Sequence, residues 1–206
     1  MRKELEVYEK LHSKKAFRGE LKYYKTIAER TFGKSTLDVG CGEGWLESFN
    51  SQIIGVDFSL FALNKAKRYC VRPNLVRADA HNLPFRDEFF EKVVSLGCLE
   101  HFENKKKAIE ELSRVLMKNG ELILVVDVDR PILRLYNLTI RVAKNILRIP
   151  SQPEENPSKS SVIHMLKSRG FSILETRDIK TRSRLARLVP GFFVSAIKTD
   201  IEKLRP

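Results

Sequence analysis

The sequence predicts an α/β fold in which a mostly parallel sheet lies between two layers of helices. From residue 36 onward, short apolar strand patterns alternate with helical patterns. Alternation at this spacing is typical of a doubly wound parallel sheet with helices on both faces. The run at 121–128 (ELILVVDV) is apolar almost throughout, as expected of a central strand covered on both sides.

The length and composition are those of one globular domain. The chain has 206 residues, of which 42% are hydrophobic and 31% charged, enough to bury a sizeable core. We expect a single domain over residues 1–206, with an N-terminal helical cap at 1–33 and a helical insertion or lid at 129–160. The start, MRKELE, lacks the apolar core of a signal peptide, so we expect a cytoplasmic protein.

The elements of the first half follow one another with short connections. Helical periodicity covers 4–32, with a break near Arg18 and Gly19. The spacing then predicts strands at 36–40, 51–57, 74–79 and 91–97. It predicts helices at 44–49, 58–70 and 104–117. Ser59 is the expected N-cap of the second of these helices, and Asn119-Gly120 is expected to end the third.

The second half is less regular. A helix is predicted at 131–149, with arginines every seven residues, and a proline-containing loop follows at 150–160. A further helix at 161–169 is expected to end at Gly170. Two strands, 171–180 and 192–198, follow five parallel ones without a helix between them, which predicts an antiparallel hairpin at the edge of the sheet.

A glycine turn marks the predicted ligand site. Gly40, Gly42 and Gly44 follow the first strand within LDVGCGEG at 37–44. Glycine adopts positive φ without strain and lets a ligand lie against bare backbone. A turn of this kind between a strand and a helix presents free N–H groups, so a nucleotide-sized ligand is expected.

Two acids end the neighbouring strands. Asp57 stands where an acid would accept both hydroxyls of a ribose, and Asp79 where a carboxylate would accept from the exocyclic amine of an adenine. Phe58 would flank the base. Trp45 occupies the position where a dinucleotide fingerprint needs its last glycine, and no Gly-x-x-x-x-Gly-Lys-Ser/Thr loop is present. A ligand with adenosine but without phosphates fits these residues better.

Five segments in order resemble the motifs of class I S-adenosylmethionine-dependent methyltransferases, of the branch called methyltransferase type 11. They are LDVGCGEG (37–44), IIGVDFS (53–59), RADAHNLPF (77–85), VVSLGCLEHF (93–102) and LMKNGELILVV (116–126). The resemblance implies a Rossmann-like, seven-stranded sheet with an antiparallel last strand. It also implies S-adenosylmethionine as the cofactor and methyl transfer as the reaction.

The same resemblance implies roles for individual residues. The three glycines would approach the methionine part of the cofactor, and Asp57 would hold the ribose. The full set of expected cofactor-binding residues is Asp38, Gly40, Gly42, Gly44, Asp57, Phe58, Asp79, Ala80 and Leu96. Cys41, Cys70 and Cys98 are odd in number and lack Cys-x-x-Cys spacing, so neither a disulfide framework nor a metal site is expected.

His101 is the candidate for a general base, if the acceptor must lose a proton. It follows the fourth predicted strand and would face the mouth of the pocket, although a capping role fits it equally well. His81, Glu103, Asp127 and Asp129 have no better claim.

The methyl acceptor is left open by the sequence. Of the net charge of +12, residues 34–127 contribute −1, with 13 basic and 14 acidic side chains, whereas residues 1–33 contribute +4 and residues 128–206, with 16 and 7, contribute +9. A small-molecule or lipid-like acceptor beneath the 129–160 lid is one expectation. Basic residues within 130–187 would equally suit RNA, as in a tRNA methyltransferase, or an anionic membrane surface. They would also suit a merely solvated face. A non-catalytic binding module of the same fold is the alternative of another class.

Overall fold

A computed structural model describes residues 21–71, 73–127, 156–179 and 191–199. Most of the predicted N-terminal cap, the predicted helix at 131–149 with its arginines, and Arg182, Arg184 and Arg187 lie outside these residues. The domain boundaries and the lid therefore stay predictions.

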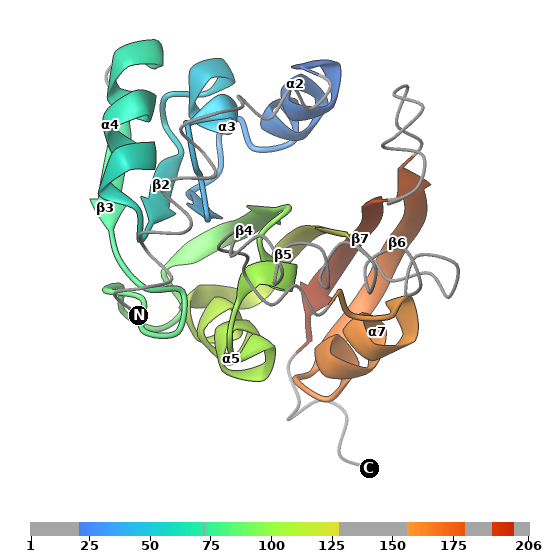
Figure 1. The fold of residues 1–206 in the computed structure, drawn as a ribbon. Coiled ribbons are helices and arrows are strands. Elements are labelled where there is room, and N and C mark those ends of the chain that lie inside the picture. Colours follow the sequence, from blue (N-terminus) through green and yellow to red (C-terminus); the bar gives the residue numbers. More distant parts are fainter. Residues whose placement is uncertain (1–20, 72, 128–155, 180–190, 200–206) are drawn as a thin grey trace, which may run out of the picture.

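Seven strands form one sheet in the order β3-β2-β1-β4-β5-β7-β6 (Figure 1). The strands are β1 (Thr36–Val39), β2 (Ile54–Asp57), β3 (Asn74–Arg77), β4 (Phe90–Leu96), β5 (Leu116–Asp127), β6 (Phe171–Ile179) and β7 (Gly191–Lys198). The first five pair in parallel, and β7 runs antiparallel to both β5 and β6. The predicted α/β fold and the antiparallel hairpin at the sheet edge are both confirmed.

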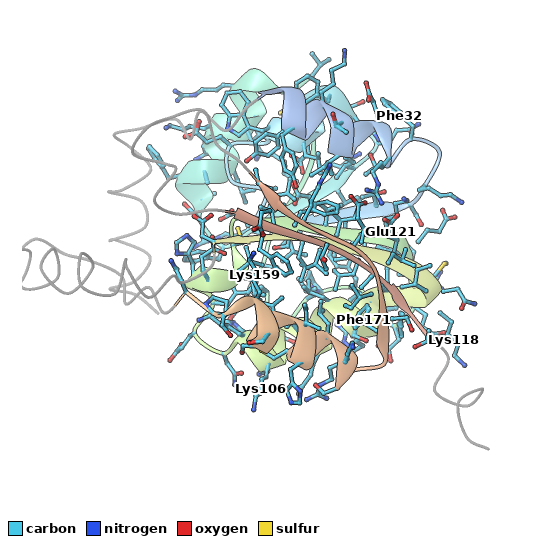
Figure 2. All side chains as sticks on the ribbon, turned by 90° about the vertical axis from the view of Figure 1, so that its right-hand side faces the viewer. Phe32, Lys106, Lys118, Glu121, Lys159 and Phe171 are labelled. Atoms are coloured by element: carbon cyan, nitrogen blue, oxygen red, sulfur yellow. The ribbon has the colours of Figure 1, made fainter. Side chains whose placement is uncertain are left out.

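The helices cover both faces of this sheet. They are α2 (Leu21–Glu29), α3 (Trp45–Phe49), α4 (Leu60–Tyr69), α5 (Lys105–Val115) and α7 (Lys159–Lys167), with a 3-10 turn at Leu99–His101. Figure 1 shows α2, α3 and α4 on one side of the sheet and α5 and α7 on the other. In the view of Figure 2, Lys106 and Lys159 lie on the side of α5 and α7, and Phe32 lies on the side of α2.

Each face has its own core. On the α5 and α7 side, Ile109, Leu112 and Leu122 are fully buried. On the α2 and α3 side, Ile27 and Phe193 are fully buried in a second cluster. Burying one such side chain contributes about 1.5–3 kcal/mol, so the two layers are held chiefly by these apolar contacts.

Side-chain caps fix where the helices begin. The Ser59 hydroxyl accepts from the Ala62 N–H at 3.2 Å, which confirms the predicted N-cap of α4. The Asn104 side chain accepts from the Lys107 N–H in the same way at the start of α5. Of the helices described, none has the length and apolar character required to cross a bilayer.

The predicted end of α5 is wrong. Helix α5 ends at Val115, not at Asn119-Gly120, and β5 starts at once with Leu116. Phe90 pairs with Leu116 and Lys92 with Glu121, so residues 117–120 bulge from the ladder, with Asn119 at φ 61°. The Phe89 N–H donates to the Val115 carbonyl at 2.9 Å. Pairing with the segment before β4 therefore ends the helix earlier than the glycine would.

Candidate cofactor-binding site

The candidate site lies where the strand order reverses. β1 pairs with β2 on one side and with β4 on the other, and both pairings are parallel. In doubly wound sheets, ligands bind beyond the carboxyl ends of the strands at such a point. The glycine turn at 40–44 begins directly after β1, and Asp57 is the last residue of β2.

All three glycines of the turn have positive φ, and at two of them there is also no room for a side chain. Gly40, Gly42 and Gly44 have φ values of 80°, 55° and 77°. A Cβ on Gly40 would lie 2.1 Å from the Cys98 Sγ, and one on Gly44 would lie 2.8 Å from the Cys70 Sγ. Over Gly42, in contrast, no atom of the residues that the structure describes lies within 4 Å of the Cβ position.

Buried thiols hold the two ends of the turn. The Cys98 thiol donates to the Gly40 carbonyl at 3.3 Å, and the Cys70 thiol donates to the Gly44 carbonyl at 3.0 Å. Burial raises the pKa of Cys70 to about 11 and that of Cys98 well above its usual value. These neutral thiols serve to position the backbone.

Asp57 links the turn to the next strand. Its Oδ2 accepts from the Gly42 N–H at 2.9 Å and its Oδ1 from the Ser59 N–H at 2.8 Å. Burial raises the pKa of Asp57, and these backbone donors oppose that effect. A carboxylate offers about four lone-pair directions, so Asp57 retains capacity to accept ribose hydroxyls.

Asp79 lies two residues beyond the end of β3, not at the end of the strand itself. Its Oδ1 accepts from the His81 N–H at 2.8 Å and contacts the His81 Nδ1 at 2.6 Å. The His81 Nε2 accepts from the Asn104 N–H at 3.2 Å, which assigns the ring proton to Nδ1. Burial raises the pKa of Asp79, but the His81 hydrogen bonds and Lys107 outweigh it, and the net pKa is lowered. The sequence did not predict this pair.

The remaining expected residues surround the same edge of the sheet. Phe58 is partly buried directly after Asp57, and its carbonyl accepts from the Arg77 Nε at 3.1 Å. Ala80 is buried in the core on the α5 side, whereas Leu96 packs on the α2 side. The structure thus brings the ends of β1 to β4 together, as the predicted site requires.

Asp38 has a neighbour that the sequence did not indicate. Its side chain is buried beside Glu47 of α3, which is 1% exposed. Burial raises the pKa of Asp38 to about 7 and that of Glu47 well above its usual value. In the sequence, Glu47 stands out only as an acid three residues after the glycine turn, which does not indicate that it is buried beside Asp38.

His101 ends the 3-10 turn after β4, and it is exposed. Its N–H donates to the Cys98 carbonyl at 2.9 Å. A proton-transfer role for its ring stays a prediction.

A basic hollow adjoins Asp79 on the α5 side. Its volume is about 840 Å³, and three consecutive lysines at the start of α5 contribute to its wall. The lining residues are Asp79, His81, Glu103, Asn104, Lys105, Lys106, Lys107, Asn156, Pro157, Ser161 and Met165. We refer to this feature below as the lysine hollow.

Comparison with known proteins agrees with this arrangement. A family model described as a methyltransferase domain matches residues 37–124. Probable tRNA methyltransferase 9B of Homo sapiens is 36% identical over 109 residues, covering 48% of this chain and 23% of the relative. The chain thus spans less than a quarter of that relative.

Two further matches cover more of the chain. An uncharacterised protein of Methanocaldococcus jannaschii is 30% identical over 185 residues, which is 86% of this chain and 65% of that protein. The crystal structure of magnesium protoporphyrin IX methyltransferase from Synechocystis PCC 6803, with bound S-adenosylhomocysteine (SAH), superposes with a TM-score of 0.67 at 19% identity. It covers 87% of this chain and 83% of that chain. Residues 37–124 thus match a methyltransferase domain, and the strand order and the glycine turn joined to Asp57 agree with the class I S-adenosylmethionine-dependent methyltransferases that the sequence resembles.

Proposed function

We propose that this protein transfers a methyl group from S-adenosylmethionine to an acceptor. The observation that carries the proposal is the glycine turn joined to Asp57 at the switch point of the sheet. Among the described residues, no atom lies within 4 Å of the Gly42 Cβ position and none donates to the buried Asp38 Oδ1, which fits a ligand with an amino-acid part at this place. When bound, the cofactor supplies a methyl group already activated on a sulfonium.

The protein's own contribution is therefore mainly alignment. Gly40, Gly42 and Gly44 leave room for the methionine part, and Asp57 accepts from the ribose hydroxyls. The adenine and the rest of the cofactor are proposed to lie among Phe58, Asp79, Ala80 and Leu96.

Titration calorimetry with S-adenosylmethionine tests this assignment. We expect binding by the wild-type protein and a loss of at least tenfold in Asp57→Ala, since each bond to a charged group contributes about 1.5–3 kcal/mol. Absence of heat in the wild type would leave the non-catalytic binding module.

His101 is proposed as the base if the acceptor must be deprotonated. Its side chain is exposed at the end of the turn after β4, at the edge of the sheet where an acceptor would stand. We expect His101→Ala to lower the methyl-transfer rate at least a hundredfold while calorimetry shows unchanged cofactor affinity. A near-normal rate would remove His101 from the mechanism.

RNA is the acceptor class that we propose. Lys105, Lys106 and Lys107 line the lysine hollow beside Asp79, and a basic groove near a reactive edge suits a phosphate backbone. The partial match to a probable tRNA methyltransferase also supports it. A small-molecule or lipid-like acceptor under residues 129–160 is the competing proposal, and docking on an anionic membrane is a third outcome.

The test compares two charge reversals of equal size. We expect K105E/K106E/K107E to weaken tRNA binding at least tenfold in filter-binding titrations and to reduce the slope of log K against log salt. The control K25E/K67E/R68E changes exposed residues of α2 and α4, on the other side of the sheet, and should have less effect. Equal losses, or co-sedimentation with phosphatidylserine vesicles in place of tRNA binding, would contradict the RNA assignment.

A further inference from the structure

The His81 ring is held from three sides. Its Nδ1–H donates to the Asp79 Oδ1 at 2.6 Å, and its Nε2 accepts from the Asn104 N–H at 3.2 Å. The ring also meets the Phe102 ring edge-on, with centroids 5.8 Å apart and an interplanar angle of 68°. Only 20% of the His81 side chain is exposed. The imidazole therefore has one orientation and one tautomer, with its proton toward Asp79.

His81 fills one oxygen of the Asp79 carboxylate. Oδ1 accepts from the His81 backbone N–H at 2.8 Å as well as from the ring, and these two donors use both of its lone pairs. Within the described part of the chain, no group donates to the other oxygen, Oδ2. The Asp79 side chain is 51% exposed. Oδ2 is thus the atom that is left for a ligand.

Asn104 connects the far nitrogen of the ring to a helix. Its Oδ1 caps α5 by accepting from the Lys107 N–H at 3.0 Å, while its own N–H donates to the His81 Nε2. Helix α5 is anchored in the core by Ile109 and Leu112. His81 therefore relates the Asp79 carboxylate to a rigid element of the fold.

The segment after β3 does not depend on His81 for its own attachment to α5. The Leu83 N–H donates to the Glu111 Oε2 at 2.8 Å. Arg114 donates to the carbonyls of Leu83 at 2.9 Å and Phe85 at 2.7 Å. These bonds hold the backbone, whereas the His81 ring acts on the Asp79 carboxylate. Loss of the ring should thus release this carboxylate and leave the segment in place.

The charge state of Asp79 determines which purine it accepts. An ionised carboxylate only accepts hydrogen bonds, so it suits the exocyclic amine of adenine and repels a carbonyl at that position. The His81 hydrogen bonds and Lys107 lower the pKa of Asp79 more than burial raises it. Asp79 is accordingly an acceptor at neutral pH.

We propose that His81 is a positioning residue that fixes the Asp79 carboxylate with Oδ2 toward the exocyclic amine of the cofactor's adenine, and so selects adenine over a purine with a carbonyl there. The inference rests on the proposed function, because it takes S-adenosylmethionine as the ligand at the switch point. His81 acts through Asp79 and does not itself touch the cofactor. Without the ring N–H, Oδ1 keeps one donor and the half-exposed side chain can turn away.

Two ligands that differ only at this position test the role. SAH carries the amine, whereas S-inosylhomocysteine carries a carbonyl in its place. In titration calorimetry we expect the wild type to bind SAH about tenfold more tightly or better, because the carbonyl would face a carboxylate oxygen.

Two variants of the same branched shape isolate the bond to Asp79. His81→Asn and His81→Leu both lose the contact with Asn104, but only Asn supplies an N–H near the place of Nδ1. We expect His81→Asn to keep most of the preference for SAH. His81→Leu should bind SAH about five- to tenfold more weakly, with its affinity for S-inosylhomocysteine unchanged. In an Asp79→Ala background, His81→Leu should cause no further loss.

A second measurement needs no cofactor. Imidazole ¹⁵N NMR of the free protein should show neutral His81 with its proton on Nδ1. A proton on Nε2, equal preferences in His81→Leu and the wild type, or an equal loss of both ligands in His81→Leu would overturn the inference while SAH binding remains. Equal binding of the two ligands by the wild type would overturn it as well. Failure of the wild type to bind either ligand, with the proton on Nδ1, would instead sink the proposed function. Circular dichroism confirms that each variant is folded.

Discussion

Gly40 is the residue at which the backbone of the site is most constrained. It combines a φ of 80° with a Cβ position 2.1 Å from the Cys98 Sγ. We expect Gly40→Ala to lower the free energy of unfolding by about 2–4 kcal/mol, as the sum of left-handed strain and overpacking. Urea denaturation measures the loss. Gly33 is the matched control, because it has a φ of 70° but no atom of the described residues within 4 Å of its Cβ position. Gly33→Ala should cost about 1–2 kcal/mol, from strain alone, and losses of equal size would refute the steric argument.

Individual residues also differ in how well their place in the structure could be predicted from the sequence. Asp57 and the glycines were predictable because they belong to a strand, a turn and the next strand at short separations. The burial of Glu47 was not predictable, because it depends on Gly55 of strand β2 leaving room for the side chain. The partners of His81 were not predictable either, since its bonds join the segment after β3 to the start of α5. Pairings between distant elements are set by tertiary packing, which local patterns do not contain.

Among the elements, the central position of β5 in the sheet was predicted from the sequence, whereas its first residue was not. Its apolar run predicted a central strand, and β5 pairs with β4 and β7. Its start was misplaced because Asn119-Gly120 resembles a helix end, whereas buried Val115 accepts from the Phe89 N–H and Leu116 pairs with Phe90, the first residue of β4. The positive φ that the glycine signal predicts does occur, at Asn119, but within a bulge.

Glu121 is the polar residue that ties β5 to its neighbours. It forms ion pairs with Lys92 of β4 and Arg30, which follows α2, and it accepts from the Ser195 Oγ of β7 at 2.7 Å. In Figure 2, Glu121 lies at the level of the sheet, between the two helical layers. Burial raises the pKa of Glu121, but Lys92 and Ser195 outweigh it, so the net pKa is lowered.

We therefore expect Glu121→Gln to destabilise the fold by about 1–2 kcal/mol at pH 7, a value reduced for partial exposure. Because the folded-state pKa lies below the unfolded one, this stabilisation is present above about pH 4.5 and is lost as the pH falls through the folded-state value. Urea denaturation of both proteins at pH 7 and pH 3.5 measures the difference. Glu91→Gln is the control, because Glu91 pairs with Lys34 at an exposed site and should change little. A destabilisation that persists unchanged at pH 3.5 would mean that packing, not charge, is responsible.

For the molecule as a whole, the alternation of elements was sufficient to predict the sheet, because parallel strands need helical crossovers and the hairpin does not. The region that determines the acceptor was not predictable in the same way. Its charge is spread over residues 128–206 without a motif, and charge alone identifies a class of partner but not a binding geometry.

The cofactor should act on the stability of the entire domain. A ligand at the switch point contacts the ends of several strands at once, and binding only the folded state stabilises it by about 2.7 kcal/mol at a concentration of 100 Kd. For a chain of 206 residues this corresponds to a rise in Tm of about 5–10 °C, measured by differential scanning calorimetry. NAD at the same concentration is the control ligand. It shares the adenosine, but its pyrophosphate needs the third fingerprint glycine where Trp45 stands, so it should leave the Tm unchanged. Asp57→Ala should lose most of the shift with S-adenosylmethionine. An equal shift with NAD would show that the turn recognises adenosine in general, and the site would then have to be reassigned to a wider class of nucleotides.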